Sequence, residues 1–180
     1  VPGRIGRACE DASAAHPHGD AVAVADGLGS VSRAAEASSR AVELALGPVR
    51  EVLQAGLPPS LLPHWFASLW RAEIGEDPQL ATTLLFAVRC PGYLVAARVG
   101  DGMALLLGPD GASRMPDGRG AWGNETAALP HDRLEMVIAP LDTNVLLATD
   151  GIADDLVPGR EVQLLKQLTD AHADLGGAAL

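Results

Sequence analysis

The chain has 180 residues, a net charge of −10 and a hydrophobic content of 48%, with only 3% aromatic residues. This length fits one domain, residues 1–180, whose core must be built mainly from Ala, Val and Leu. The acidic balance argues against a nucleic-acid partner, and no apolar run approaches the ~20 residues of a membrane span. The two isolated cysteines indicate reduced thiols in a cytoplasmic protein.

The N-terminal part of the chain predicts one strand and one helix. Residues 1–20 form a polar opening, and an apolar strand is expected at 21–26. From Ser32 onward, apolar residues recur at three- and four-residue spacing, which is typical of a helix. Ser30 or Ser32 is the predicted cap of this helix.

Two further helical stretches follow. Pro48 interrupts or restarts the first helix, and a second stretch runs to about Gln54. Ser60, after a proline pair, is a candidate cap for a helix that ends near Glu73. This last helix carries three of the six aromatic side chains, which indicates packing against a sheet.

From residue 81 the periodicity changes to that of strands. The Gly- and Pro-rich stretch 108–131 is expected to be loop, with a hairpin turn at Asp110-Gly111, and residues 160–175 return to a helical pattern. This order of elements predicts an α+β fold, an antiparallel sheet with helices packed on it. The expected strands are 81–89, 93–99, 103–107, 134–139 and 144–149.

Three apolar runs end abruptly in an aspartate that precedes a glycine: Asp26, Asp101 and Asp150. A carboxylate at the end of a buried strand is costly unless it is paired, hydrogen-bonded or bound to a cation. Asp-Gly is also a common hairpin turn, the interpretation that suits Asp110. A helical pattern follows Asp26 and Asp150, which favours a shared cation site, whereas Asp101 fits either interpretation.

The acidic motifs and two further motifs follow one another along the chain in a defined order. In chain order they are Glu10-Asp11 after Cys9, Val24-Ala-Asp26-Gly27-Leu-Gly29, Ala81-Thr82-Thr83, Ala97-Arg-Val-Gly100-Asp101-Gly102, Asn124-Glu125-Thr126 and Leu146-Leu-Ala-Thr-Asp150-Gly151-Ile-Ala-Asp154. The order and spacing, over residues 4 to 156, resemble the metal-dependent serine/threonine protein phosphatases, the PPM or type 2C family, in its shorter bacterial branch. The resemblance implies a four-layer α-β-β-α sandwich of two mainly antiparallel sheets flanked by helices.

The resemblance also implies a centre of two Mn²⁺ or Mg²⁺ ions, which favour oxygen ligands. By this correspondence Asp26 would bridge both ions, the Gly27 carbonyl and Glu10 would hold one ion, and Asp150 the other. A close approach of the backbone to the metal would explain the glycine at position 27.

Four more residues receive roles from the resemblance. Asp11 would act beside Glu10, and Asp101 and Asp154 match positions that help hold a weaker third ion. Arg7, just before the acidic pair, is the candidate for gripping the phosphate. Two metal ions can activate water for in-line attack on a phosphate monoester without a covalent enzyme intermediate.

The implied function is hydrolysis of phosphoserine and phosphothreonine in proteins, opposing a partner Ser/Thr kinase. Leu28 stands where many family members have a histidine. The closing D-D/N-x-T motif of the family is missing, so we expect a single domain truncated at its C-terminus. The alternative is a catalytically weak phosphatase-like regulatory or binding module. An amide hydrolase with an N-terminal nucleophile would need Thr, Ser or Cys where the chain has Val1.

Overall fold

The computed structural model describes residues 9–115, 126–153, 155–156 and 159–174, which form two antiparallel sheets. The larger sheet has the strand order β1-β2-β3-β4-β7 and the smaller one β6-β5-β8. The strands are β1 (Asp11–Ala15), β2 (Ala21–Asp26), β3 (Leu84–Cys90), β4 (Tyr93–Val99), β5 (Met103–Gly108), β6 (Gly111–Arg114), β7 (Glu135–Pro140) and β8 (Asn144–Ala148).

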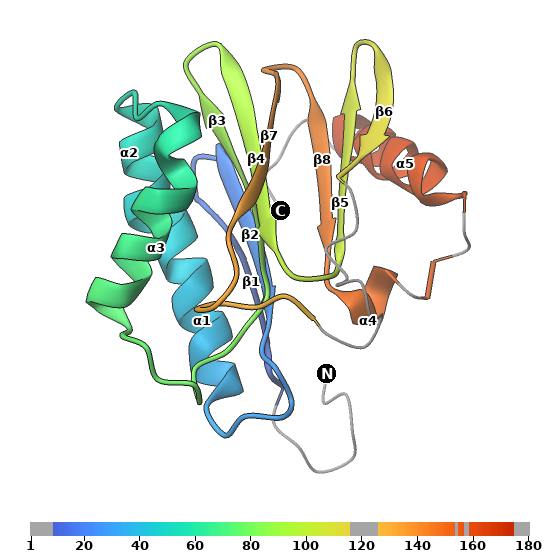
Figure 1. The fold of residues 1–180 in the computed structure, drawn as a ribbon. Coiled ribbons are helices and arrows are strands. Elements are labelled where there is room, and N and C mark those ends of the chain that lie inside the picture. Colours follow the sequence, from blue (N-terminus) through green and yellow to red (C-terminus); the bar gives the residue numbers. More distant parts are fainter. Residues whose placement is uncertain (1–8, 116–125, 154, 157–158, 175–180) are drawn as a thin grey trace.

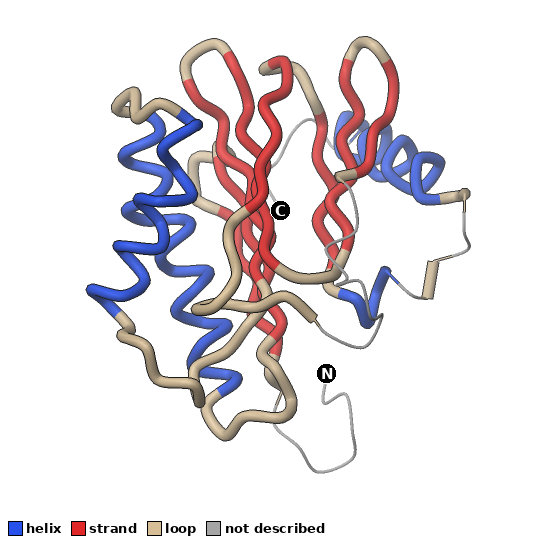
Figure 2. The backbone as a smooth tube through the Cα atoms, in the orientation of Figure 1, coloured by secondary structure: helices blue, strands red, loops and turns tan. Residues whose placement is uncertain are grey.

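Helices cover the outer faces of both sheets (Figure 1, Figure 2). The helices are α1 (Ala34–Leu44), α2 (Arg50–Gln54), α3 (Leu62–Glu73), α4 (Asp150–Ala153) and α5 (Glu161–Asp174). Helices α1 to α3 lie on the five-stranded sheet, and α5 packs on β5 and β8 of the smaller sheet. The layers therefore run α-β-β-α, and the predicted fold class is confirmed.

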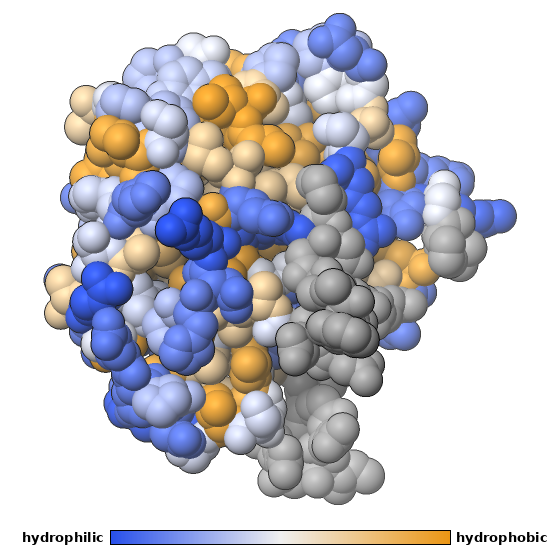
Figure 3. Space-filling model, in the orientation of Figure 1, coloured by the Kyte–Doolittle hydropathy of each residue, from blue (hydrophilic) through white to orange (hydrophobic). Residues whose placement is uncertain are grey.

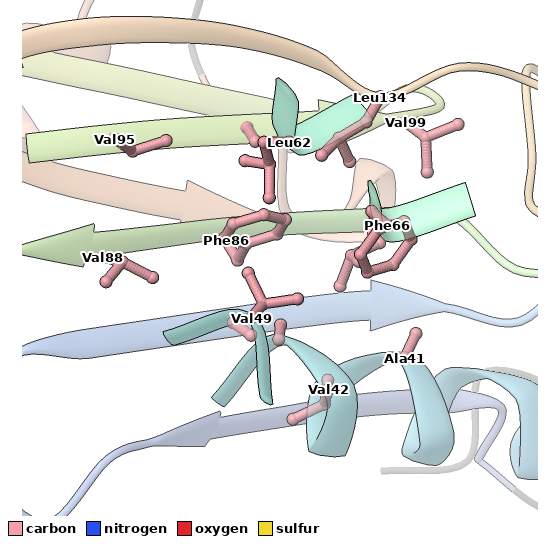
Figure 4. Close-up of a cluster of buried hydrophobic side chains, with 14 of the residues drawn as sticks. Ala41, Val42, Val49, Leu62, Phe66, Phe86, Val88, Val95, Val99 and Leu134 are labelled. Atoms are coloured by element: carbon pink, nitrogen blue, oxygen red, sulfur yellow. The ribbon is translucent and has the colours of Figure 1, made fainter. Parts of the chain in front are cut away.

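The main core lies between the helices and the larger sheet. On α3, Leu62, Phe66 and Trp70 are buried at intervals of four residues, so they share the face that meets the sheet. Phe66 stacks against Phe86 of β3 with ring centroids 6.4 Å apart, and both side chains point into the cluster drawn in Figure 4. The predicted packing of this helix on a sheet is confirmed.

Strand β3 is buried on both faces because it lies inside the sandwich. Phe86 and its alternate neighbours face the helices, whereas Leu85 and Ala87 face the smaller sheet. There they meet Ala104 and Leu106 of β5. The outer strand β7 is more open, with Ile138 57% exposed, and Figure 3 shows apolar and polar residues intermixed on this side of the molecule.

The N-terminal part departs from the sequence prediction at two points. The polar opening predicted for 1–20 contains the strand β1, an exposed edge strand of small residues without the apolar alternation that would reveal it. Neither predicted serine caps α1. Instead, the Ser32 amide and hydroxyl donate to Gln79 Oε1 (3.1 and 3.0 Å), and Arg33 is the cap residue of the helix.

The helical region also differs from its prediction around the prolines. Pro48 lies in a π-helical turn, Ala45–Val49, that joins α1 to α2 without a break. Proline has no N–H group to donate a helical hydrogen bond. A π-turn accommodates this missing donor, so the helix continues past Pro48. Ser60 does not cap a helix but lies in a 3₁₀ turn, Pro59–Leu61, that leads into α3.

The meander is confirmed with small shifts. Strand β3 begins at Leu84 rather than 81. The backbone groups of residues 81–83 bond instead to Leu28, to Leu129 and to Asp26 at the end of β2. The stretch 108–131 contains β6, which completes the hairpin expected at Asp110-Gly111. The helix predicted at 160–175 is observed as α5.

Asp20 links the β1–β2 turn to helix α2 and should make folding acid-sensitive. Its carboxylate accepts hydrogen bonds from Arg50 and from Gln54 Nε2 (2.7 Å), and it lies 2.9 Å from His16 Nδ1. The Arg50 guanidinium holds the pKa of Asp20 well below its usual range. A lowered folded-state pKa stabilises the fold above the unfolded pKa, and this stabilisation is lost as pH falls.

We therefore expect Asp20→Asn to lower the melting temperature by a few degrees at pH 7 and to flatten its decline between pH 5 and pH 2. Thermal unfolding followed by circular dichroism across this range measures both effects. Asp110→Asn, in an exposed turn, is the matched control. If Asp20→Asn and the wild type lost stability equally at low pH, Asp20 would not be a source of the acid sensitivity.

Candidate active site

Three acidic side chains meet at one end of the sandwich. Asp26 is the last residue of β2, and Asp11, the first residue of β1, is its direct partner in the antiparallel register. Asp150 begins α4 immediately after β8, at the same end of the sandwich (Figure 1). The ends of strands from both sheets therefore supply this cluster. The Asp-Gly motifs predicted this strand-end position for Asp26 and Asp150.

The surroundings of Asp26 oppose its ionisation. Burial, followed by the neighbouring carboxyls of Asp11 and Asp150, raises the pKa of Asp26 to about 8. Like charges held together in a partly desolvated site cannot all ionise without a compensating cation. At neutral pH this carboxyl is therefore mainly protonated when no cation is bound.

The donor set suits a hard divalent cation. Carboxylate oxygens are the preferred protein ligands of Mg²⁺ and Mn²⁺, and a dication would offset the repulsion among Asp11, Asp26 and Asp150. Within the described residues, no three acidic, His or Cys side chains are already arranged as the ligands of one ion. The residues thus fit a metal in chemistry and position, and their side chains would have to adjust to bind it.

Glu10 lies beside the loop that follows Asp26. Its carbonyl oxygen accepts hydrogen bonds from the Gly27 amide (3.1 Å) and from the Ser38 hydroxyl (2.6 Å). A Cβ added at Gly29 would lie 3.1 Å from Glu10 Oε2, so the Glu10 carboxylate sits against this loop. The backbone thus places Glu10 beside Gly27, the residue after Asp26.

Gly27 is required by the start of helix α1. A Cβ at this position would lie 2.4 Å from the Ala34 carbonyl oxygen and 2.8 Å from the Ala34 Cβ. The structure thus gives a reason for this glycine that the sequence does not, the close approach of a helix.

We expect Gly27→Ala to destabilise the fold by about 2 kcal/mol or more, because backbone atoms of α1 must move to admit the methyl group. Gly47→Ala is the control, since a Cβ there meets nothing within 4 Å in the described part of the chain and helix propensity favours alanine. Urea unfolding measures both changes. A cost at position 27 no larger than at position 47 would contradict this packing.

Asp101 stands apart from the three-carboxylate cluster. It lies in the β4–β5 turn between Gly100 and Gly102, whose φ angles of +98° and +91° favour glycine. Its Oδ2 accepts a hydrogen bond from the Thr126 hydroxyl (3.1 Å). Asp101 is not among the groups that raise the pKa of Asp26, which are Asp11 and Asp150.

Two predicted site residues, Arg7 and Asp154, lie outside the described residues. Two residues near the site, Thr82 and Thr83, received no role from the sequence analysis, although both lie in one of its motifs. They are buried just before β3, where their hydroxyl groups bond to the Asp26 backbone. The adjacent hydroxyls before an apolar strand are a signal that could have pointed to them.

The fold and the acidic strand ends define a layered phosphatase-like domain, and comparison with known proteins agrees. The sequence profile described as Protein phosphatase 2C matches residues 4–177. The chain belongs to the protein phosphatase 2C family. No curated protein sequence matches it.

Solved structures share the fold at low sequence identity. PppA of Pseudomonas aeruginosa, described as a key regulatory component of T6SS, has 20% identity and a TM-score of 0.65, over 89% of this chain and 77% of its own. The catalytic domain of PstP, in complex with 2 manganese ions, has 20% identity and a TM-score of 0.63, over 93% and 80%. Stp1 of Staphylococcus aureus has 16% identity and a TM-score of 0.61, over 93% and 84%.

In the part of the chain that the structure describes, no helix combines the length and the apolar character that crossing a bilayer demands.

Proposed function

We propose that this chain removes phosphate from phosphoserine and phosphothreonine in proteins, with two Mn²⁺ or Mg²⁺ ions and a weaker third. The observation that carries the proposal is the meeting of Asp11, Asp26 and Asp150 at one end of the sandwich, where they raise the pKa of Asp26. Family membership and the manganese ions bound to the PstP catalytic domain support it.

The chain's own residues would divide the work by position. Asp26, between Asp11 and Asp150, would contact both ions and release its proton when they bind, while Glu10 and the Gly27 carbonyl would complete one side. Asp101 and Asp154 would serve the third ion, and Arg7 would orient the phosphate. When bound, the cations supply the Lewis acidity that activates water and neutralises the phosphoryl oxygens.

The partners follow from this chemistry. The substrate would be a phosphoprotein, either a Ser/Thr kinase or a target of that kinase. We further propose that residues 1–180 form one catalytic domain.

Phosphate release from a phosphothreonine peptide tests the proposal. We expect turnover with Mn²⁺, none with a chelator, and a loss of at least 100-fold in Asp150→Asn, whereas the exposed Asp110→Asn keeps the wild-type rate. Folded protein that is silent with every metal would favour the alternative, a regulatory or binding module.

A further inference from the structure

The backbone of Asp26 is held by two threonines, through two side-chain hydroxyls and one backbone amide. The amide of Asp26 donates to the Thr83 hydroxyl oxygen (3.0 Å), and the Thr83 amide donates to the Asp26 carbonyl (2.8 Å). The same carbonyl also accepts from the Thr82 hydroxyl (2.9 Å). Both polar groups of the Asp26 backbone are therefore satisfied by these two side chains and by the Thr83 amide, just before β3.

The Thr83 hydroxyl replaces one bond at the end of the β2–β3 ladder. The regular register of the two strands ends at Val24 and Leu85, and its continuation would pair Asp26 with Thr83. In a continued ladder the Asp26 amide would donate to a strand carbonyl. Here a side-chain hydroxyl takes that bond, so the orientation of the strand end depends on the residue type at 83.

The Thr83 side chain is itself fixed by packing. It is 4% exposed, and a Cβ added at Gly100 would lie 2.6 Å from its Cγ2 methyl group. Because Gly100 and the methyl group already fill this space, the hydroxyl is directed toward Asp26 rather than into the β4–β5 turn. Gly100, a glycine with positive φ in the Gly-Asp-Gly motif, thus sets the orientation of the Thr83 side chain in the Ala-Thr-Thr motif.

We propose that Thr83 is a positioning residue that fixes the strand end of Asp26, and so its carboxyl, for metal binding and phosphoryl transfer. The proposal rests on the proposed phosphatase function. Partners of metal ligands commonly change metal affinity or activity by 10- to 100-fold when they are replaced. Thr83→Val keeps the shape and the methyl contact with Gly100 but removes the hydroxyl.

The test compares Thr83→Val, Thr83→Ser and a matched control in the complete chain. Thr143→Val is the control, because Thr143 is also buried yet its hydroxyl finds no hydrogen-bond partner among the described residues. The measurements are kcat and KM on a phosphothreonine peptide, Mn²⁺ affinity by calorimetry, and hydrogen exchange of the Asp26 amide by NMR.

We expect Thr83→Val to lower kcat about 10- to 100-fold with KM within about threefold. We also expect it to weaken Mn²⁺ binding and to speed exchange of the Asp26 amide at least tenfold. Thr83→Ser restores all three, and Thr143→Val leaves them unchanged.

Unchanged kcat, Mn²⁺ affinity and amide exchange in Thr83→Val would overturn the proposal. An equal loss in Thr83→Val, Thr83→Ser and Thr143→Val would also overturn it, because the effect would then be general destabilisation. If the wild type releases no phosphate with any metal, the proposed function fails instead. The Asp26 amide exchange and Mn²⁺ affinity then still decide the positioning role.

Discussion

Asp26→Asn is expected to reduce phosphatase activity on the order of 10³-fold, equal to about 4 kcal/mol of transition-state stabilisation. Asparagine keeps the size and the backbone bonds of Asp26 but removes the negative charge that a cation requires. The same substitution is expected to stabilise the metal-free protein, because the carboxyl is held in surroundings that oppose its charge.

The pH dependence of this stabilisation has a defined sign. The folded pKa of Asp26, about 8, is above the unfolded value of 3.8. The contribution of the protonated carboxyl is therefore complete below pH 3.8 and is lost as pH rises through 8. Asparagine does not titrate, so its advantage grows with pH.

We expect Asp26→Asn to be more stable than the wild type by about 1–2 kcal/mol at pH 9 and close to it at pH 4. This is less than the full pKa shift implies, because the half-buried carboxyl is partly screened by solvent. Urea unfolding in a chelator at both pH values measures the difference, and added Mn²⁺ should stabilise only the wild type. Equal stabilities at pH 4 and pH 9 would contradict the predicted state of Asp26.

Phe66→Ala is expected to cost about 3–5 kcal/mol of unfolding free energy, because it leaves a cavity at the centre of the main core. Phe66 is 1% exposed and packs between Trp70 and Phe86, with ring centroids 6.3 and 6.4 Å away. The surrounding helices and the sheet are fixed by many other contacts, so they cannot close fully around the missing ring.

Leu61→Ala is the control for this experiment. Leu61 directly precedes α3 but is 51% exposed, so its truncation should change stability by no more than about 0.5 kcal/mol. Urea unfolding of both variants measures the contrast, and Phe66→Leu should fall between them. A cost below about 1 kcal/mol for Phe66→Ala would mean that the ring does not anchor this core.

Local patterns predict most of the fold. The four-residue spacing of Leu62, Phe66 and Trp70 reveals both the helix and its buried face. Strand β1 escapes prediction because an exposed edge strand of alanine and serine carries no apolar alternation. Pro48 is misleading because a helix can pass a proline through a π-turn, which depends on the packing around it.

The candidate site is predictable in its residues but not in its contacts. Asp-Gly at the ends of apolar runs identifies Asp26 and Asp150. The pairing of Asp11 with Asp26 depends on the register of the β1–β2 hairpin, which the motif order does not contain. The role of Thr83 depends on a contact across the sheet and on the space left by Gly100, and neither is a local property of the sequence.

The bond between Asp26 and Thr83 also has a consequence for the order of folding. The two residues are 57 positions apart, and helices α1 to α3 lie between them in the chain. Closing so long a loop costs conformational entropy that only further long-range contacts repay, so such pairings form slowly. We therefore expect the helices to form before this strand end is fixed, and a newly synthesised chain to acquire its acidic cluster as one of its last folding events.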